Sequence, residues 1–198
     1  MLLGDSRTSA PLGTWQQPLA DSLTAASGFL WSYVNRAVAG ASLEYLNSVV
    51  RAPESLSWLL DPVPATYAVP AVLINYGVND IYYPHGFGGG PSGISHLDEA
   101  AWKARLGAML DAVHAKFPAA IIYVTRPWMR GYDADCDTLA GWIATVLSTR
   151  SPWAVAGDDE RVWLKGADNG ATMTSDGLHY STTGNAQKAV QMKTVMGY

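Results

Sequence analysis

The chain has 198 residues, of which 48% are hydrophobic and 15% are charged, with a net charge of -4. This length and composition indicate one globular domain over residues 1–198 and exclude a disordered or fibrous chain. The weak negative charge, with no dense run of lysine or arginine, argues against binding to nucleic acid, and the single cysteine, Cys136, excludes an internal disulfide.

Apolar runs alternate with helix-like segments along the chain, which is the pattern of a parallel sheet covered by helices on both faces. In chain order the pattern predicts a strand over 1–3, a helix over 14–26, a strand over 29–34, a helix over 42–50 and a strand over 71–74. It then predicts a helix over 97–117, a strand over 121–125, a helix over 137–149, a short strand over 162–164 and a helix over 183–195. We therefore expect an α/β protein, a three-layer α/β/α sandwich with a flavodoxin-like parallel sheet.

The longest predicted loop, 81–96, contains five glycines and two prolines. Ordinary connections are shorter, so we expect this loop to act as a mobile lid. Residues 88–93 formally match the Gly-x-Gly-x-x-Gly dinucleotide pattern, but no strand precedes them and no helix opens within them. No histidine pair has the i, i+4 spacing of a helical metal site. We therefore expect neither a cofactor nor a metal.

Polar residues follow several predicted strands directly, and the carboxyl ends of parallel strands meet at one edge of a sheet. Ser6 follows the first strand within Gly4-Asp5-Ser6, and Asn79 follows the strand over 71–74. A serine needs a base to become a nucleophile, and His179 in Asp176-Gly177-Leu178-His179 is the candidate. Asp176, three residues earlier, is placed to orient the imidazole.

These clusters, together with Asn35-Arg36-Ala37-Val38-Ala39-Gly40, resemble the SGNH hydrolases, also called GDSL esterases and lipases. The resemblance extends from Gly4 to His179. It implies the SGNH hydrolase fold, Ser6 as nucleophile, Asp176 and His179 as acid and base, and an oxyanion hole formed by Ser6, Gly40 and Asn79. The sequence departs from the family pattern at Arg7, where leucine is commonest, and this departure bears on substrate more than on chemistry.

The resemblance implies a serine esterase that cleaves short-chain carboxylic esters, with O-acetyl groups on carbohydrates as one candidate. Two alternatives stay open: a lysophospholipase or thioesterase, and a non-catalytic glycan-binding module of the same fold. The expected partner is a small-molecule or carbohydrate ester. Candidate substrate contacts are Arg126, His85 and Trp128; for Trp128, packing in the core is the competing interpretation.

No stretch of the sequence approaches the roughly 20 apolar residues that a membrane-spanning helix needs. No basic and apolar leader precedes Gly4. We therefore expect a protein that works where it is made, or one from which a leader has been removed. The pattern does not predict an oligomeric state.

Overall fold

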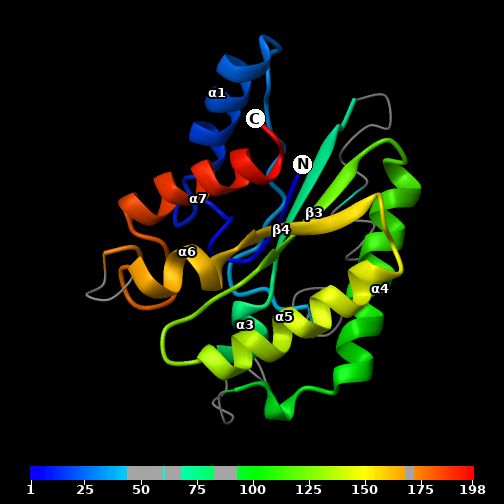
Figure 1. Cartoon of the computed structure of the whole chain (residues 1–198), viewed down its shortest axis with the longest axis vertical. Helices are drawn as coiled ribbons and strands as arrows, with labels where there is room; N and C mark the ends of the chain where they lie inside the picture. Colours follow the sequence, from blue (N-terminus) through cyan, green and yellow to red (C-terminus); the bar gives the residue numbers. More distant parts are fainter. Residues whose placement is uncertain (44–59, 61–67, 83–92, 168–171) are drawn as a thin grey trace.

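Four parallel strands form the centre of the computed structural model, which describes residues 1–43, 60, 68–82, 93–167 and 172–198 (Figure 1). The strands are β1 (Leu2–Gly4), β2 (Ala71–Asn75), β3 (Ile121–Arg126) and β4 (Ala154–Asp159), and their order in the sheet is β1-β2-β3-β4. All five residues of β2 are buried, as its uninterrupted apolar run predicts for a strand covered on both faces.

A further segment runs parallel to β1 along its free edge. The Leu2 N–H donates to the Val34 carbonyl, and the Arg36 and Val38 N–H groups donate to the Leu2 and Gly4 carbonyls, each at 2.9 Å. Together with an isolated parallel bridge between Leu2 and Asn35, these bonds place the segment where the second strand lies in the flavodoxin-like order 2-1-3-4-5. The segment itself is not a strand, and the sheet consists of β1 to β4.

The strand predicted over 29–34 does not form. The helix before it, α1 (Gln16–Ser27), ends at Gly28, whose φ of 74° turns the chain away from the helix axis. Phe29 and Leu30 are 76% and 89% exposed, and contact with β1 begins only at Val34. Apolar residues alone do not show where a returning chain first meets the sheet.

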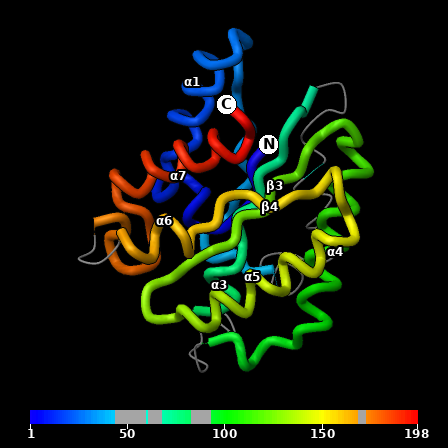
Figure 2. The backbone as a smooth tube through the Cα atoms, in the orientation of Figure 1, coloured from blue at the N-terminus to red at the C-terminus, as the bar shows by residue number. Residues whose placement is uncertain are grey.

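Helices cover both faces of the sheet. On one face α1 packs beside α7 (Thr182–Val195), as Figures 1 and 2 show, and on the other α4 (Glu99–Lys116) packs against α5 (Asp133–Ser148). The shorter α3 (Val78–Tyr82) and α6 (Glu160–Ala167) follow the carboxyl ends of β2 and β4, and a 3-10 turn, η2 (Ile94–His96), precedes α4. The three-layer α/β/α sandwich expected from the sequence is confirmed.

Two errors in the predicted elements fall together near residue 160. The short strand predicted over 162–164 is part of α6, and the strand before it, β4, was not predicted. The buried residues of α6 are Glu160 and Leu164, one helical turn apart, whereas Val162 between them is 78% exposed. Residues 44–50 of the predicted helix over 42–50 lie outside the described part of the chain.

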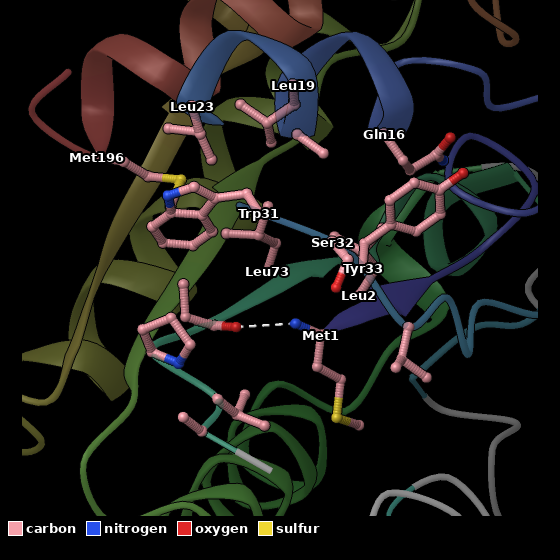
Figure 3. Close-up of a pocket in the computed structure, with 16 residues that line it drawn as sticks. Met1, Leu2, Gln16, Leu19, Leu23, Trp31, Ser32, Tyr33, Leu73 and Met196 are labelled. Carbon is pink, nitrogen blue, oxygen red and sulfur yellow. Dashed lines mark hydrogen bonds between the residues drawn. The ribbon is translucent and has the colours of Figure 1, made fainter. Parts of the chain in front are cut away.

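An apolar cavity of about 310 Å³ lies between α1 and the amino-terminal part of the sheet (Figure 3). Leu19 and Leu23 of α1 line it opposite Leu73, and the Trp31 ring closes one side. The described residues that line it include none of the proposed catalytic or oxyanion-hole residues. In the described part of the chain, no helix is both long and apolar enough to cross a membrane.

Candidate active site

Ser6 lies in a tight turn directly after β1. The Asp5 carbonyl accepts hydrogen bonds from the Thr8 and Ser9 N–H groups, and the Asp5 carboxylate accepts one from the Arg7 N–H at 2.9 Å. Glycine is required before this turn, because a Cβ atom at Gly4 would lie only 2.7 Å from the Asn75 carbonyl oxygen. The turn therefore packs directly against the end of β2.

His179 lies in a loop that Asp176 holds together. The Asp176 Oδ1 atom accepts hydrogen bonds from the Leu178 N–H at 2.9 Å and the His179 N–H at 2.7 Å, and its Oδ2 atom lies 2.6 Å from His179 Nδ1. Partial burial alone would raise the pKa of the Asp176 carboxyl, but these hydrogen bonds outweigh it and lower the pKa to about 2. Asp176 is therefore ionised at neutral pH.

The two loops meet at the carboxyl edge of the sheet. Ser6 Oγ lies 3.0 Å from His179 Nε2, across 173 residues of sequence. Ser6 is 5% exposed, and the His179 side chain is 23% exposed. The structure thus brings Asp176, His179 and Ser6 together in one hydrogen-bonded series, and their catalytic roles stay a prediction. This is the arrangement of a nucleophile, its base and the acid that orients the base.

The segment that contains Gly40 is bonded both to the end of β1 and to Asn79. The Val38 N–H donates to the Gly4 carbonyl, which fixes the segment before Gly40 against the end of β1. Gly40 has a φ of 76°, a conformation that glycine adopts without strain. The buried Asn79 amide donates to the Ala41 carbonyl at 3.0 Å. Among the described residues this is the one acceptor for the amide, which has two hydrogens to donate.

The residue after Asn79 has a structural role. The Asp80 carboxylate accepts hydrogen bonds from the Leu43 N–H at 3.1 Å and from the Trp102 indole N–H at 2.9 Å. It thereby ties α3 to α4 and to the chain that follows Gly40. These bonds hold the Asn79 helix against its neighbours.

The three candidate substrate contacts have different outcomes. Trp128 is 4% exposed and its indole N–H donates to the Asp133 carboxylate at 2.7 Å, so the structure shows core packing and leaves no open ring face for stacking. Arg126, the last residue of β3, forms an ion pair with Asp159 at 3.4 Å. His85, and residues 83–92 of the predicted lid, lie outside the described residues.

A buried cluster of charged residues beside the site escaped the sequence analysis. Its members are at most 1% exposed: Arg7, Asp158, Glu160 and Lys188. The Lys188 ammonium donates to Asp158 at 2.8 Å and to Glu160 at 3.0 Å. Arg7 donates to Glu160 at 2.5 Å. Two features of the sequence could have indicated this cluster. Arg7 departs from the family pattern, and Lys188 lies on the buried side of α7 beside Ala189.

Burial and charge act in opposite directions on the Glu160 carboxyl. Desolvation raises its pKa, but the Lys188 and Arg7 charges, with hydrogen bonds from Tyr180 and the Trp128 N–H, lower it below its ordinary value. At the neighbouring Asp158 carboxyl burial prevails over the Lys188 charge and raises the pKa. Among the described residues, no group of three or more histidine, cysteine, aspartate or glutamate side chains is arranged to hold a metal ion.

The family model described as "GDSL-like Lipase/Acylhydrolase family" matches residues 2–187. The chain therefore belongs to the GDSL-like lipase/acylhydrolase family, and it is a carboxylic ester hydrolase. This confirms the resemblance to the SGNH hydrolases inferred from the sequence. Comparison of the sequence with curated proteins gives no match.

Solved structures share the fold at low sequence identity. A mutant of Axe2, an acetyl-xylooligosaccharide esterase from Geobacillus Stearmophilus, has a TM-score of 0.72 and 15% identity, covering 100% of this chain and 93% of that one. A carbohydrate esterase family 3 protein from Talaromyces cellulolyticus has a TM-score of 0.70 and 17% identity, covering 99% and 94%. TesA has a TM-score of 0.67 and 17% identity, covering 99% and 97%.

Proposed function

We propose that this protein is a serine esterase that hydrolyses short-chain carboxylic esters through an acyl-enzyme. Acetyl groups on carbohydrate hydroxyls are its foremost candidate substrates. The observation that carries the proposal is the continuous chain of contacts from Ser6 Oγ to His179 Nε2, at 3.0 Å, and from His179 Nδ1 to Asp176 Oδ2, at 2.6 Å. Both distances are within the range over which a proton is transferred along a hydrogen bond.

In the first half of the reaction, Ser6 Oγ attacks the ester carbonyl carbon while His179 Nε2 takes the hydroxyl proton. Asp176 stabilises the imidazolium that forms. The N–H groups of Ser6 and Gly40 and the Asn79 amide donate hydrogen bonds to the new oxyanion. When the carbonyl re-forms, the bond to the leaving alcohol breaks and His179 returns its proton to the alcohol oxygen.

In the second half, water replaces the alcohol. His179 takes a proton from the water, the hydroxide oxygen attacks the acyl carbon, and a second oxyanion forms in the same place. Its collapse breaks the bond to Ser6 Oγ, which recovers the proton from His179. The carboxylic acid leaves, and the enzyme returns to its starting state.

Two observations support a short acyl group. Two of the structurally similar proteins are named as an acetyl-xylooligosaccharide esterase and a carbohydrate esterase. The apolar cavity beneath α1, which has the size to hold an alkyl chain, is lined by none of Ser6, His179, Gly40 or Asn79. The lysophospholipase or thioesterase alternative needs a long apolar groove at Ser6. The glycan-binding alternative gives no reason for an aligned triad.

The test measures hydrolysis of p-nitrophenyl acetate, butyrate and octanoate, and of acetylated xylooligosaccharides, by the wild type and by Ser6→Ala. Ser9→Ala is the matched control, because Ser9 is buried in the same turn and its hydroxyl has no partner among the described residues. We expect acetate to be the best of the three aryl esters, Ser6→Ala to be inactive and Ser9→Ala to keep its activity. A fluorophosphonate probe should label the wild type at Ser6 only.

Preference for octanoate would favour the lysophospholipase or thioesterase alternative. Absence of both turnover and labelling at Ser6 would overturn the serine esterase and favour the glycan-binding module.

A further inference from the structure

The residue that follows the proposed nucleophile reaches across the site to the histidine loop. Arg7 is completely buried, and its Nε atom donates to the Leu178 carbonyl at 2.5 Å. Leu178 directly precedes His179 in sequence. One backbone bond therefore separates Ser6 from Arg7, and one hydrogen bond joins Arg7 to the residue beside His179.

The residue on the other side of His179 is held by the same charged pair. The Arg7 Nη1 atom donates to Glu160 Oε2 at 2.5 Å, and the Tyr180 hydroxyl donates to Glu160 Oε1. The Arg7 guanidinium also lies 5.1 Å from the centroid of the Tyr180 ring, within the range of a cation–π contact. The Arg7–Glu160 pair thus holds both sequence neighbours of His179.

The pair is itself fixed from several directions. Glu160 begins α6 and accepts a hydrogen bond from the Trp128 N–H at 3.1 Å and another from Lys188 of α7 at 3.0 Å. Both side chains of the pair are 0% exposed. A buried ion pair contributes little net stability compared with apolar residues of the same size, whereas its fixed geometry restricts how its partners lie. We therefore expect this pair to matter more for the positions of the residues that it contacts than for stability.

The planar, forked shape of the guanidinium is essential to this arrangement. Its Nε and Nη1 atoms point to different acceptors, Leu178 and Glu160, from one rigid plane. A lysine ammonium is a single point of charge and does not reproduce two diverging contacts at fixed spacing. Lysine at position 7 would keep the charge opposite Glu160 while it loosens the bond to the histidine loop.

We propose that Arg7 is a positioning residue for catalysis: through Leu178 and the Glu160–Tyr180 contact it sets the distance and angle between His179 and Ser6. This inference rests on the proposed serine esterase function. Arg7 itself touches no reacting atom. Its effect falls on the rate of proton transfer between Ser6 and His179, which depends steeply on geometry.

The test compares Arg7→Lys with Asp158→Asn. Asp158 belongs to the same buried cluster, but its partners are Thr125, Trp163 and Lys188, so it touches neither the Ser6 turn nor the histidine loop. With p-nitrophenyl acetate, well below the unfolding temperature of each variant, we expect Arg7→Lys to lower kcat about 10- to 100-fold with KM within about twofold of wild type. Asp158→Asn should lose stability and keep kcat.

A second variant guards against failure of Arg7→Lys to fold. Tyr180→Phe removes only the hydroxyl that reaches Glu160 and keeps the ring beside Arg7. We expect a smaller loss of kcat, about 3- to 10-fold, with KM again unchanged. If both substitutions lower stability while kcat stays within twofold of wild type, Arg7 has a structural role only and the proposal is overturned.

A measurement without turnover separates this inference from the proposed function. The ¹⁵N signals of the His179 ring report its tautomer and its hydrogen bonds to Asp176 and Ser6. In Arg7→Lys we expect these signals to shift or broaden, while Asp158→Asn keeps the wild-type spectrum. If the wild type hydrolyses no ester and Ser6 takes no label, the esterase proposal fails, and the His179 signals still decide whether Arg7 positions the ring. An unchanged His179 spectrum in Arg7→Lys would overturn the positioning role.

Discussion

Asp176 holds His179 by two different contacts: one carboxylate oxygen lies 2.6 Å from the ring Nδ1 atom, and the other accepts the His179 backbone N–H at 2.7 Å. The same residue therefore fixes both the ring and the backbone that carries it. In Asp176→Asn the amide can present N–H to Nδ1 and favour the wrong tautomer, with Nε2 protonated. We expect kcat to fall by roughly 10³- to 10⁴-fold, by analogy with the same change in other triads.

The check is kcat for p-nitrophenyl acetate beside Asp111→Asn. Asp111 is 57% exposed and pairs with Arg150 away from the site, so its loss should leave kcat unchanged. Equal activity of Asp176→Asn and wild type would show that another group orients His179.

The buried Asp5 carboxyl predicts a pH-dependent stability. Burial raises its pKa to about 7, against the opposing effect of the Arg7 charge. The folded protein therefore holds this proton up to about pH 7, whereas the unfolded chain releases it near pH 4. Stability is highest below pH 4 as far as this group is concerned, and it falls as pH rises to about 7.

Asp5→Asn removes this titration. The free energy of unfolding is measured with urea at pH 5 and at pH 8 for both proteins. It should fall between the two pH values by on the order of 1–3 kcal/mol more in the wild type than in Asp5→Asn. The comparison uses only the difference between the two pH values, so any constant cost of the amide cancels. Parallel pH profiles for the two proteins would contradict the raised pKa.

Asn79 is expected to act on the transition state. Asn79→Ala removes the amide donor to the oxyanion, and we expect kcat to fall about 10²- to 10³-fold with little change in KM. The substitution also removes the hydrogen bond to the Ala41 carbonyl, so stability is measured in parallel by thermal unfolding. A variant that unfolds earlier but keeps kcat would place Asn79 outside the oxyanion hole.

The apolar cavity offers a test of the acyl-chain preference. Ala20 of α1 lines it, and Ala20→Leu adds apolar volume to a space of about 310 Å³. We expect stability to rise by about 0.5–1.5 kcal/mol, as in other cavity-filling substitutions, with the rates for acetate, butyrate and octanoate in unchanged proportion. A selective loss of the octanoate rate would mean that the cavity receives the acyl chain.

The sequence predicted best where one physical cause dominates. The apolar run of β2 needs burial on both faces, and the stripe of α4 that contains Trp102, Leu106 and Val113 needs a sheet to cover; both elements lie where predicted, within two residues. The roles proposed for the triad and Asn79 stay a prediction, but the structure does bring Ser6, His179 and Asp176 together at the sheet edge. There, polar residues directly after predicted strands and the parallel order of those strands indicate the same edge of the sheet.

The errors occur where tertiary contact decides. β4 ends in Gly157, Asp158 and Asp159, a polar sequence that does not look like a strand. It is one because its backbone pairs with β3, and the buried Asp158 carboxylate is satisfied by Lys188 and Thr125. Trp128 follows a strand at the proposed active edge, yet it is buried and its indole N–H is bonded to Asp133. The buried charges of Arg7 and Glu160 are 153 residues apart, and no local pattern pairs them.

The 173 residues between Ser6 and His179 also bear on refolding experiments. The two side chains meet only when the turn after β1 and the loop before α7 both lie at the carboxyl edge of the sheet. If the proposed roles of Ser6 and His179 hold, ester hydrolysis returns only after this edge has formed. The recovery of activity would then report on contacts between distant parts of the chain, which a measurement of helix content does not resolve.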